Sequence, residues 1–160
     1  MKPRPHLLAP LVLTACLLLT ASVVSGCASR TGSDSKLNER LAAAVDEGPG
    51  TQFYMRDLTD FTWHKLYVFA LRTAQAKIDA ALGFAWPRPA AIGAGDATVI
   101  LAFVADGRVV RYALPSRSGA DFAGLVSGSP YVRASQPWTP GSALFRIGPD
   151  RKVQQGYVAP

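Results

Sequence analysis

The feature that most constrains the fold of this chain is a pair of apolar runs, residues 98–104 and 109–114, on either side of Asp106-Gly107. Both members of an Asp-Gly pair tolerate a positive φ angle, which the favoured two-residue hairpin turns require. Short apolar runs bounded by turn residues are typical of buried strands. We therefore expect the two runs to form neighbouring antiparallel strands joined by this turn.

Other apolar patterns predict two helices and four further strands. Residues 36–47 and 73–82 repeat apolar side chains at helical spacing, with Ser35 and Thr73 as candidate N-caps and Gly83 as a stop for the second helix. The further strands are expected at 52–56, 63–70, 143–147 and 153–158, the last two joined by residues 148–151 as a second hairpin. Because hairpins dominate, the predicted fold class is α+β: a two-layer domain, mainly antiparallel, with two short helices on one face.

The N-terminus has the pattern of a secretory signal. Lys2 and Arg4 are followed by the uncharged residues 7–24 and then by the small pair Ser25-Gly26. The segment that ends at Cys27, Val-Ser-Gly-Cys, resembles the lipobox of bacterial lipoproteins. That resemblance implies a diacylglycerol thioether on Cys27, cleavage before it, and acylation of the new terminus.

The same segment has two other interpretations. The uncharged stretch of 18 residues, 7–24, is just long enough for a transmembrane helix. Pro10 near its start and small polar residues near its end favour a cleaved signal instead. A second loose lipobox ends at Cys16, but it would leave only residues 7–12 as the apolar core.

The lipobox therefore predicts three segments: a signal peptide at 1–26, a lipidated cysteine with a flexible tether at 27–35, and a single domain at 36–160. The expected location is the cell envelope, where the lipid anchor holds the protein to a membrane. Ala28, rather than Asp, follows Cys27, and by resemblance to the Gram-negative sorting pattern this points to the periplasmic face of the outer membrane.

Composition argues against several functional classes. Removal of residues 1–26 leaves 134 residues with 15 basic and 11 acidic side chains. The arginines are scattered rather than interleaved with aromatics, so no nucleic-acid partner is expected. Cys27 is the last cysteine and His64 the last histidine, so neither a disulfide framework nor a zinc site is expected, and no cofactor is predicted.

Three segments together resemble a family of small uncharacterised bacterial lipoproteins. They are DLTDFTWHKLYVF at 57–69, IDAALGFAW at 78–86 and LAFVADGRVVRY at 101–112. The family pattern usually has an acid where this chain has His64. The resemblance implies an envelope location and a similar fold, and it brings no established activity.

The candidate catalytic residues are few. His64 is the only histidine outside the signal, and Asp57 and Asp60 lie three residues apart in a turn-like segment near it. No G-x-S-x-G nucleophile elbow is present. These residues leave open a small cell-wall-modifying hydrolase centred on His64 and Asp60.

The candidate binding patch lies on the strand at 63–70. Strand alternation places Trp63, Tyr67 and Phe69 on one side and aliphatic residues on the other. We expect the aliphatic side to face the helices, which would leave the aromatic side partly open for a partner. Arg111 and Arg117 could add anion contacts.

These observations predict a non-catalytic binding or accessory role toward an envelope protein or a cell-wall component. Two alternatives stay open. One is the hydrolase centred on His64 and Asp60, and the other is an inhibitor of an envelope enzyme.

Overall fold

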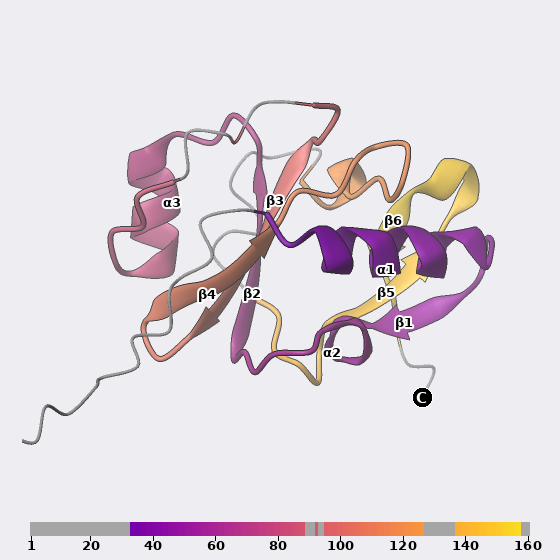
Figure 1. The fold of residues 1–160 in the computed structure, drawn as a ribbon, viewed down its shortest axis with the longest axis horizontal. Coiled ribbons are helices and arrows are strands. Elements are labelled where there is room, and N and C mark those ends of the chain that lie inside the picture. Colours follow the sequence, from indigo (N-terminus) through magenta and orange to yellow (C-terminus); the bar gives the residue numbers. More distant parts are fainter. Residues whose placement is uncertain (1–32, 89–91, 93–94, 127–136, 158–160) are drawn as a thin grey trace, which may run out of the picture.

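The structure, a computed structural model, describes residues 33–88, 92, 95–126 and 137–157 (Figure 1). Two three-stranded antiparallel sheets combine with three helices, which confirms the predicted α+β class. The strand orders are β1-β5-β6 and β2-β3-β4. The elements are α1 (Ser35–Asp46), β1 (Gln52–Tyr54), α2 (Met55–Leu58), β2 (Lys65–Ala70), α3 (Gln75–Leu82), β3 (Val99–Ala105), β4 (Arg108–Ala113), β5 (Leu144–Ile147) and β6 (Val153–Gln155), with short 3-10 turns at Ala123–Leu125 and Pro149–Arg151.

The central hairpin forms as its sequence predicts. β3 pairs with β4 in antiparallel register, and the turn between them is made by Asp106 at φ 51° and Gly107 at φ 70°. Positive φ at both turn positions is the geometry that matches the twist of the flanking strands. The C-terminal hairpin of β5 and β6 is confirmed as well, and Asp150 and Arg151 adopt positive φ in its connection.

The two predicted helices form, with differences at their starts. α1 buries Leu37, Leu41, Ala44 and Val45 on one face. Its N-cap is Asp34 rather than Ser35, because the carboxylate of Asp34 is the group that accepts the backbone N–H of Leu37, at 3.0 Å.

α3 ends as predicted at Gly83, whose φ of 80° is the left-handed conformation that glycine adopts without strain. Its start differs from the prediction. The N-cap position is held by Ala74, without a side-chain bond, and the Thr73 hydroxyl does not cap the helix. Within the described part of the chain, that buried hydroxyl has no hydrogen-bond partner.

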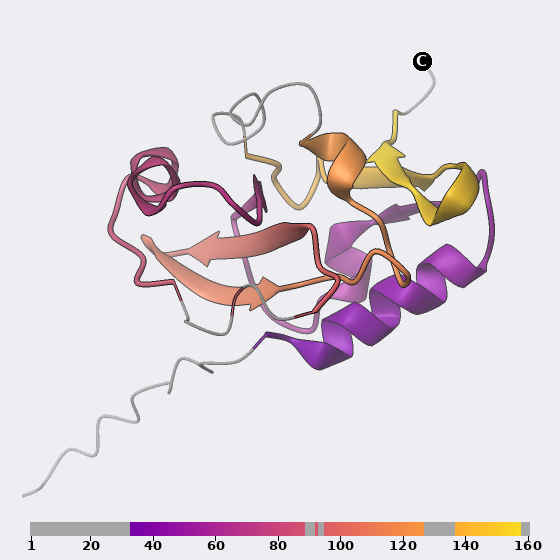
Figure 2. The same ribbon diagram turned by 90° about the horizontal axis from the view of Figure 1, so that it is seen from above.

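The sheet β2-β3-β4 is covered on both faces. All seven residues of β3 are buried. On one face Leu66, Leu101 and Phe103 pack with α1, and on the other Tyr67, Phe69 and Ile100 pack with α3. Figure 2 shows α1 and α3 on opposite sides of this sheet. The sequence predicted both helices on one face, but a strand that is apolar on both sides requires a cover on each.

The sheet β1-β5-β6 is covered on one face only. Phe53, Phe145 and Val153 point into the same core as α1. The register places Gln52, Arg146 and Gln154 side by side on the opposite face, where all three are exposed. This sheet therefore has the alternating pattern that is typical of a half-solvated antiparallel sheet.

The predicted signal peptide and the proposed lipid site, Cys27, lie outside the described residues. The described chain begins with Ser33 and Asp34, which the sequence assigned to the tether. Both are held in the fold, because the Asp34 N–H donates to the Tyr112 carbonyl and the Leu114 N–H donates to the Ser33 hydroxyl. Among the helices of the described ranges, none is long and apolar enough to cross a bilayer.

Candidate functional site

The prediction of an exposed aromatic patch on the strand at 63–70 is wrong, because its aromatic side chains are buried. Trp63, Tyr67 and Phe69 expose only 3%, 4% and 1% of their area. The prediction assumed that one face of this strand stays open, whereas α3 covers that face. Burial also raises the pKa of the Tyr67 hydroxyl above its ordinary value.

Trp63 does not lie on the side that alternation gave it. It precedes β2 and packs in the α1-side core, where its ring meets Phe103 edge-on with centroids 5.4 Å apart. Its indole N–H donates to the Thr59 hydroxyl at 3.0 Å. Tyr67 and Phe69 stack on each other on the α3 side, with centroids 5.8 Å apart. The aromatic residues of this segment therefore pack on both sides of the β2-β3-β4 sheet, in the core on the α1 side and in the core on the α3 side.

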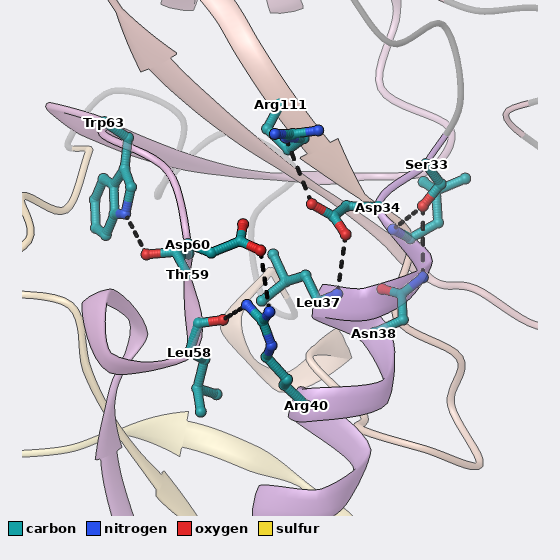
Figure 3. Close-up of polar contacts among 11 residues, drawn as sticks. Ser33, Asp34, Leu37, Asn38, Arg40, Leu58, Thr59, Asp60, Trp63 and Arg111 are labelled. Carbon is teal, nitrogen blue, oxygen red and sulfur yellow. Dashed lines mark hydrogen bonds and ion pairs between the residues drawn. The ribbon is translucent and has the colours of Figure 1, made fainter.

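Arg111, the fourth member of the predicted patch, is engaged within the domain. Its Nε lies 3.5 Å from the Asp34 carboxylate (Figure 3). Its guanidinium stands over the Phe61 ring, 4.9 Å from the ring centroid. Both partners of this ion pair are mostly buried, with side-chain exposures of 20% and 11%. Because Asp34 also caps α1, Arg111 ties the start of this helix to β4.

His64 and Asp60, the two residues of the alternative hydrolase, do not form a hydrogen bond or an ion pair with each other. The Arg40 guanidinium donates to the Asp60 carboxylate and to the Leu58 carbonyl, at 3.0 and 2.9 Å (Figure 3). The hydrogen bond from Arg40 lowers the pKa of the Asp60 carboxyl, which keeps this group ionised and makes it a poor proton donor at neutral pH. The His64 side chain is exposed, and no described residue bonds it. Nor do the described ranges contain a cluster of three potential metal ligands.

A pocket of about 740 Å³ lies at the end of the β2-β3-β4 sheet where β2 ends and β3 begins. This volume lies within the usual range for small-molecule sites. Its walls include Leu71 and Arg72 after β2, Arg88 beyond α3, Thr98 before β3, and Arg117 after β4. Three arginines from distant parts of the sequence thus line one hollow, which we call the arginine pocket.

The three arginines are held in different ways. Arg88 is anchored by its Nη1, which donates to the carbonyls of Leu71 and Thr73 at 3.2 and 3.3 Å. Arg72 is exposed and has no hydrogen bond or ion pair with another described residue. Arg117 has one distant carboxylate, Asp121 at 3.9 Å, and its side chain is 64% exposed.

One further carboxylate lies beside the pocket and is itself engaged. Asp96 accepts from the backbone N–H and the hydroxyl of Ser118 at 3.3 and 3.0 Å, and its carbonyl accepts the Arg117 N–H. Neither Arg72 nor Arg88 is paired with a carboxylate of the described chain. The arginine pocket therefore retains net positive charge and N–H donors, the combination that recognises carboxylate or phosphate groups.

Only part of this site could be found in the sequence. The sequence offers Arg117 as a residue for anion contacts, but it does not show which residues lie near Arg117 in space. Arg88 stands between Pro87 and Pro89, which limits the backbone around it, and this was the one local signal of a positioned arginine.

Comparisons of this chain with protein-family models, with curated proteins and with solved structures found no match.

Proposed function

We propose that this protein is a lipid-anchored, non-catalytic binding protein of the bacterial envelope, and that it recognises an anionic group of an envelope component in the arginine pocket. The observation that carries the proposal is the convergence of Arg72, Arg88 and Arg117 on one pocket without a matching set of carboxylates. Guanidinium groups bind carboxylates and phosphates through paired N–H donors, so the pocket suits a ligand that bears one of these groups.

The anchoring half of the proposal rests on the sequence. The segment that ends at Cys27 resembles a lipobox, and the three segments at 57–69, 78–86 and 101–112 resemble small bacterial lipoproteins. Incorporation of a labelled fatty acid by the native chain, and its loss in Cys27→Ala, would support this half. Label that persists in Cys27→Ala but disappears in Cys16→Ala would contradict the choice of cysteine.

The binding half is tested by titration of the purified lipidated protein in neutral detergent with inorganic phosphate and with acetate. Arg72→Gln removes a guanidinium that has no partner within the described fold, so the protein should stay folded. We expect the affinity of the anion to fall roughly tenfold, because a hydrogen bond to a charged group contributes about 1.5–3 kcal/mol.

Arg146→Gln is the matched control, because it removes the same charge from the open face of the β1-β5-β6 sheet. Equal losses of affinity in Arg72→Gln and Arg146→Gln would mean that the anion senses only net charge, and the pocket would not be its site.

The hydrolase and inhibitor alternatives have less support. The hydrolase would need Asp60 free to exchange protons with His64 or substrate, but Arg40 binds this carboxylate. The inhibitor would need an exposed surface that contacts its target enzyme, and the aromatic residues that were expected to contact a partner are buried. Turnover of a wall-derived substrate that is lost in both His64→Ala and Asp60→Asn would restore the hydrolase.

A further inference from the structure

We propose that the anionic group recognised by the arginine pocket is the phosphate of a phospholipid in the same membrane that holds the anchor, so that this end of the domain docks on the bilayer. This inference rests on the function proposed above, because it takes the lipid anchor on Cys27 as given. It adds the class of ligand and the orientation of the domain.

The first argument is where the chain joins the domain. Ser33 accepts a hydrogen bond from the Leu114 N–H at 3.0 Å. Arg117 follows Leu114 by three residues, and three residues of extended chain span at most about 11 Å. The intervening Ser116 pairs with Ala97, a residue of the pocket wall. The tether therefore joins the domain at the pocket end of the β2-β3-β4 sheet.

The second argument is the length of chain between the anchor and the domain. Residues 28–32 separate Cys27 from Ser33. Six steps of fully extended chain reach at most about 20 Å. With an acylated Cys27 at the membrane surface, Ser33 stays within this distance of the lipid headgroups. The end of the domain that carries the arginine pocket is thus the end that the anchor holds near phosphate.

The third argument is charge. Arg72, Arg88 and Arg117 line the pocket, and the exposed Lys36 follows Ser33 in the first turn of α1. Basic side chains near an anionic bilayer are drawn to it. The planar guanidinium group also carries paired N–H donors, and their spacing matches two oxygens of a phosphate. Arg146 lies on the other sheet, and it shares neither the pocket nor the position beside the tether.

The experiment uses the full lipidated protein in vesicles of phosphatidylcholine, with or without phosphatidylglycerol. One probe is attached at Ser118→Cys beside Arg117, and in a second preparation at Gln154→Cys on the open face of the β1-β5-β6 sheet. Quenching by a headgroup-labelled lipid reports which part of the domain lies at the membrane. We expect phosphatidylglycerol to increase quenching at position 118 and not at position 154.

The variants test whether the pocket is responsible. The ratio of docked to undocked domains should fall about fivefold for each of Arg72→Gln and Arg88→Gln, since a basic residue near an anionic surface contributes about 1 kcal/mol. It should stay unchanged in Arg146→Gln. Circular dichroism of each variant verifies that the domain is folded, and any unfolded variant is replaced by Arg117→Gln.

A second experiment distinguishes free phosphate from lipid phosphate. Inorganic phosphate or glycerol phosphate is titrated into the protein in phosphatidylcholine vesicles, and its binding is measured. Binding of free phosphate that needs Arg72, without any effect of phosphatidylglycerol, would overturn the lipid inference and leave the proposed anion pocket intact. Absence of all anion binding would overturn both. Equal quenching at positions 118 and 154 would also overturn the proposed orientation.

Discussion

Two groups of arginines in this domain have different surroundings. Arg40 and Arg111 lie around the start of α1, and each faces a carboxylate, Asp60 at 3.0 Å and Asp34 at 3.5 Å (Figure 3). Arg72 and Arg88 line the arginine pocket, where the described chain gives neither of them a carboxylate. The charge of the first group is balanced by carboxylates of the fold. In the second group, Arg88 donates hydrogen bonds only to backbone carbonyls, so the charges of Arg72 and Arg88 stay unbalanced and can attract a ligand.

This difference explains why Arg111 was a misleading candidate. The residue type was suitable for an interface, but its charge is already balanced by Asp34 and its plane is covered by Phe61. An arginine contributes to binding when its charge is not satisfied within its own domain. The comparison leads to four predictions, given from the largest expected effect on stability to the smallest.

The largest effect is expected for Trp63→Ala. The indole is buried against Phe103, so its removal leaves a large cavity. We expect a loss of about 3–5 kcal/mol in the free energy of unfolding, measured by urea denaturation. Trp63→Phe should lose less, because it keeps an aromatic ring. A loss of less than about 1 kcal/mol for Trp63→Ala is what a surface substitution would give, and it would contradict a core position for Trp63.

Asp34→Ala comes second. It removes the N-cap of α1 and leaves the Arg111 Nε without its carboxylate, so we expect a loss of about 1–2 kcal/mol. Asp34→Asn retains a capping oxygen and should recover part of the loss, which separates the cap from the ion pair. Anion affinity at the arginine pocket should be the same in both variants. A parallel loss of affinity would show that the two arginine groups are coupled.

The third prediction concerns how the Arg40–Asp60 ion pair makes stability depend on pH. Arg40 lowers the pKa of Asp60 below its ordinary value of 3.8, so the ion pair contributes its full stability above this pH. The contribution is lost as pH falls from 3.8 through the lower pKa of the folded state. The difference in stability between the native protein and Asp60→Asn should therefore shrink below pH 3.8. Added salt should reduce it at neutral pH, since the pair is exposed. A difference that is independent of pH would contradict this.

Arg72→Gln should have the smallest effect on stability, within about 0.5 kcal/mol, because this exposed side chain bonds nothing in the described fold. Thermal unfolding of this variant and of Arg111→Gln compares the two groups of arginines directly. Arg111→Gln should destabilise the domain and leave anion affinity unchanged, whereas Arg72→Gln should do the reverse. The same phenotype in both variants would remove the distinction between the two arginine groups.

The sequence predicted local structure well where the chemistry of a few neighbouring residues decides it. Asp106-Gly107 indicated a hairpin because its backbone tolerates positive φ, and Gly83 indicated the end of α3 for the same reason. The apolar stripe of α1 was likewise read from its spacing. The strand at 63–70 was located to within two residues, but the face it would expose was not.

What the sequence determined by itself is thus the α+β class, the helices α1 and α3, and the two hairpins, because each of these depends on residues close together in the chain. The short helix α2 was not expected, because residues 52–56 were predicted as a strand. The signal that ends at Cys27 stays a prediction. The tertiary structure alone decided that the strands divide into two sheets and that α1 and α3 cover opposite faces of β2-β3-β4. It also decided which arginines meet a carboxylate. Arg72, Arg88 and Arg117 come together only when the ends of β2, α3 and β4 are brought to one place, and no local pattern records contacts between residues that are so far apart in sequence.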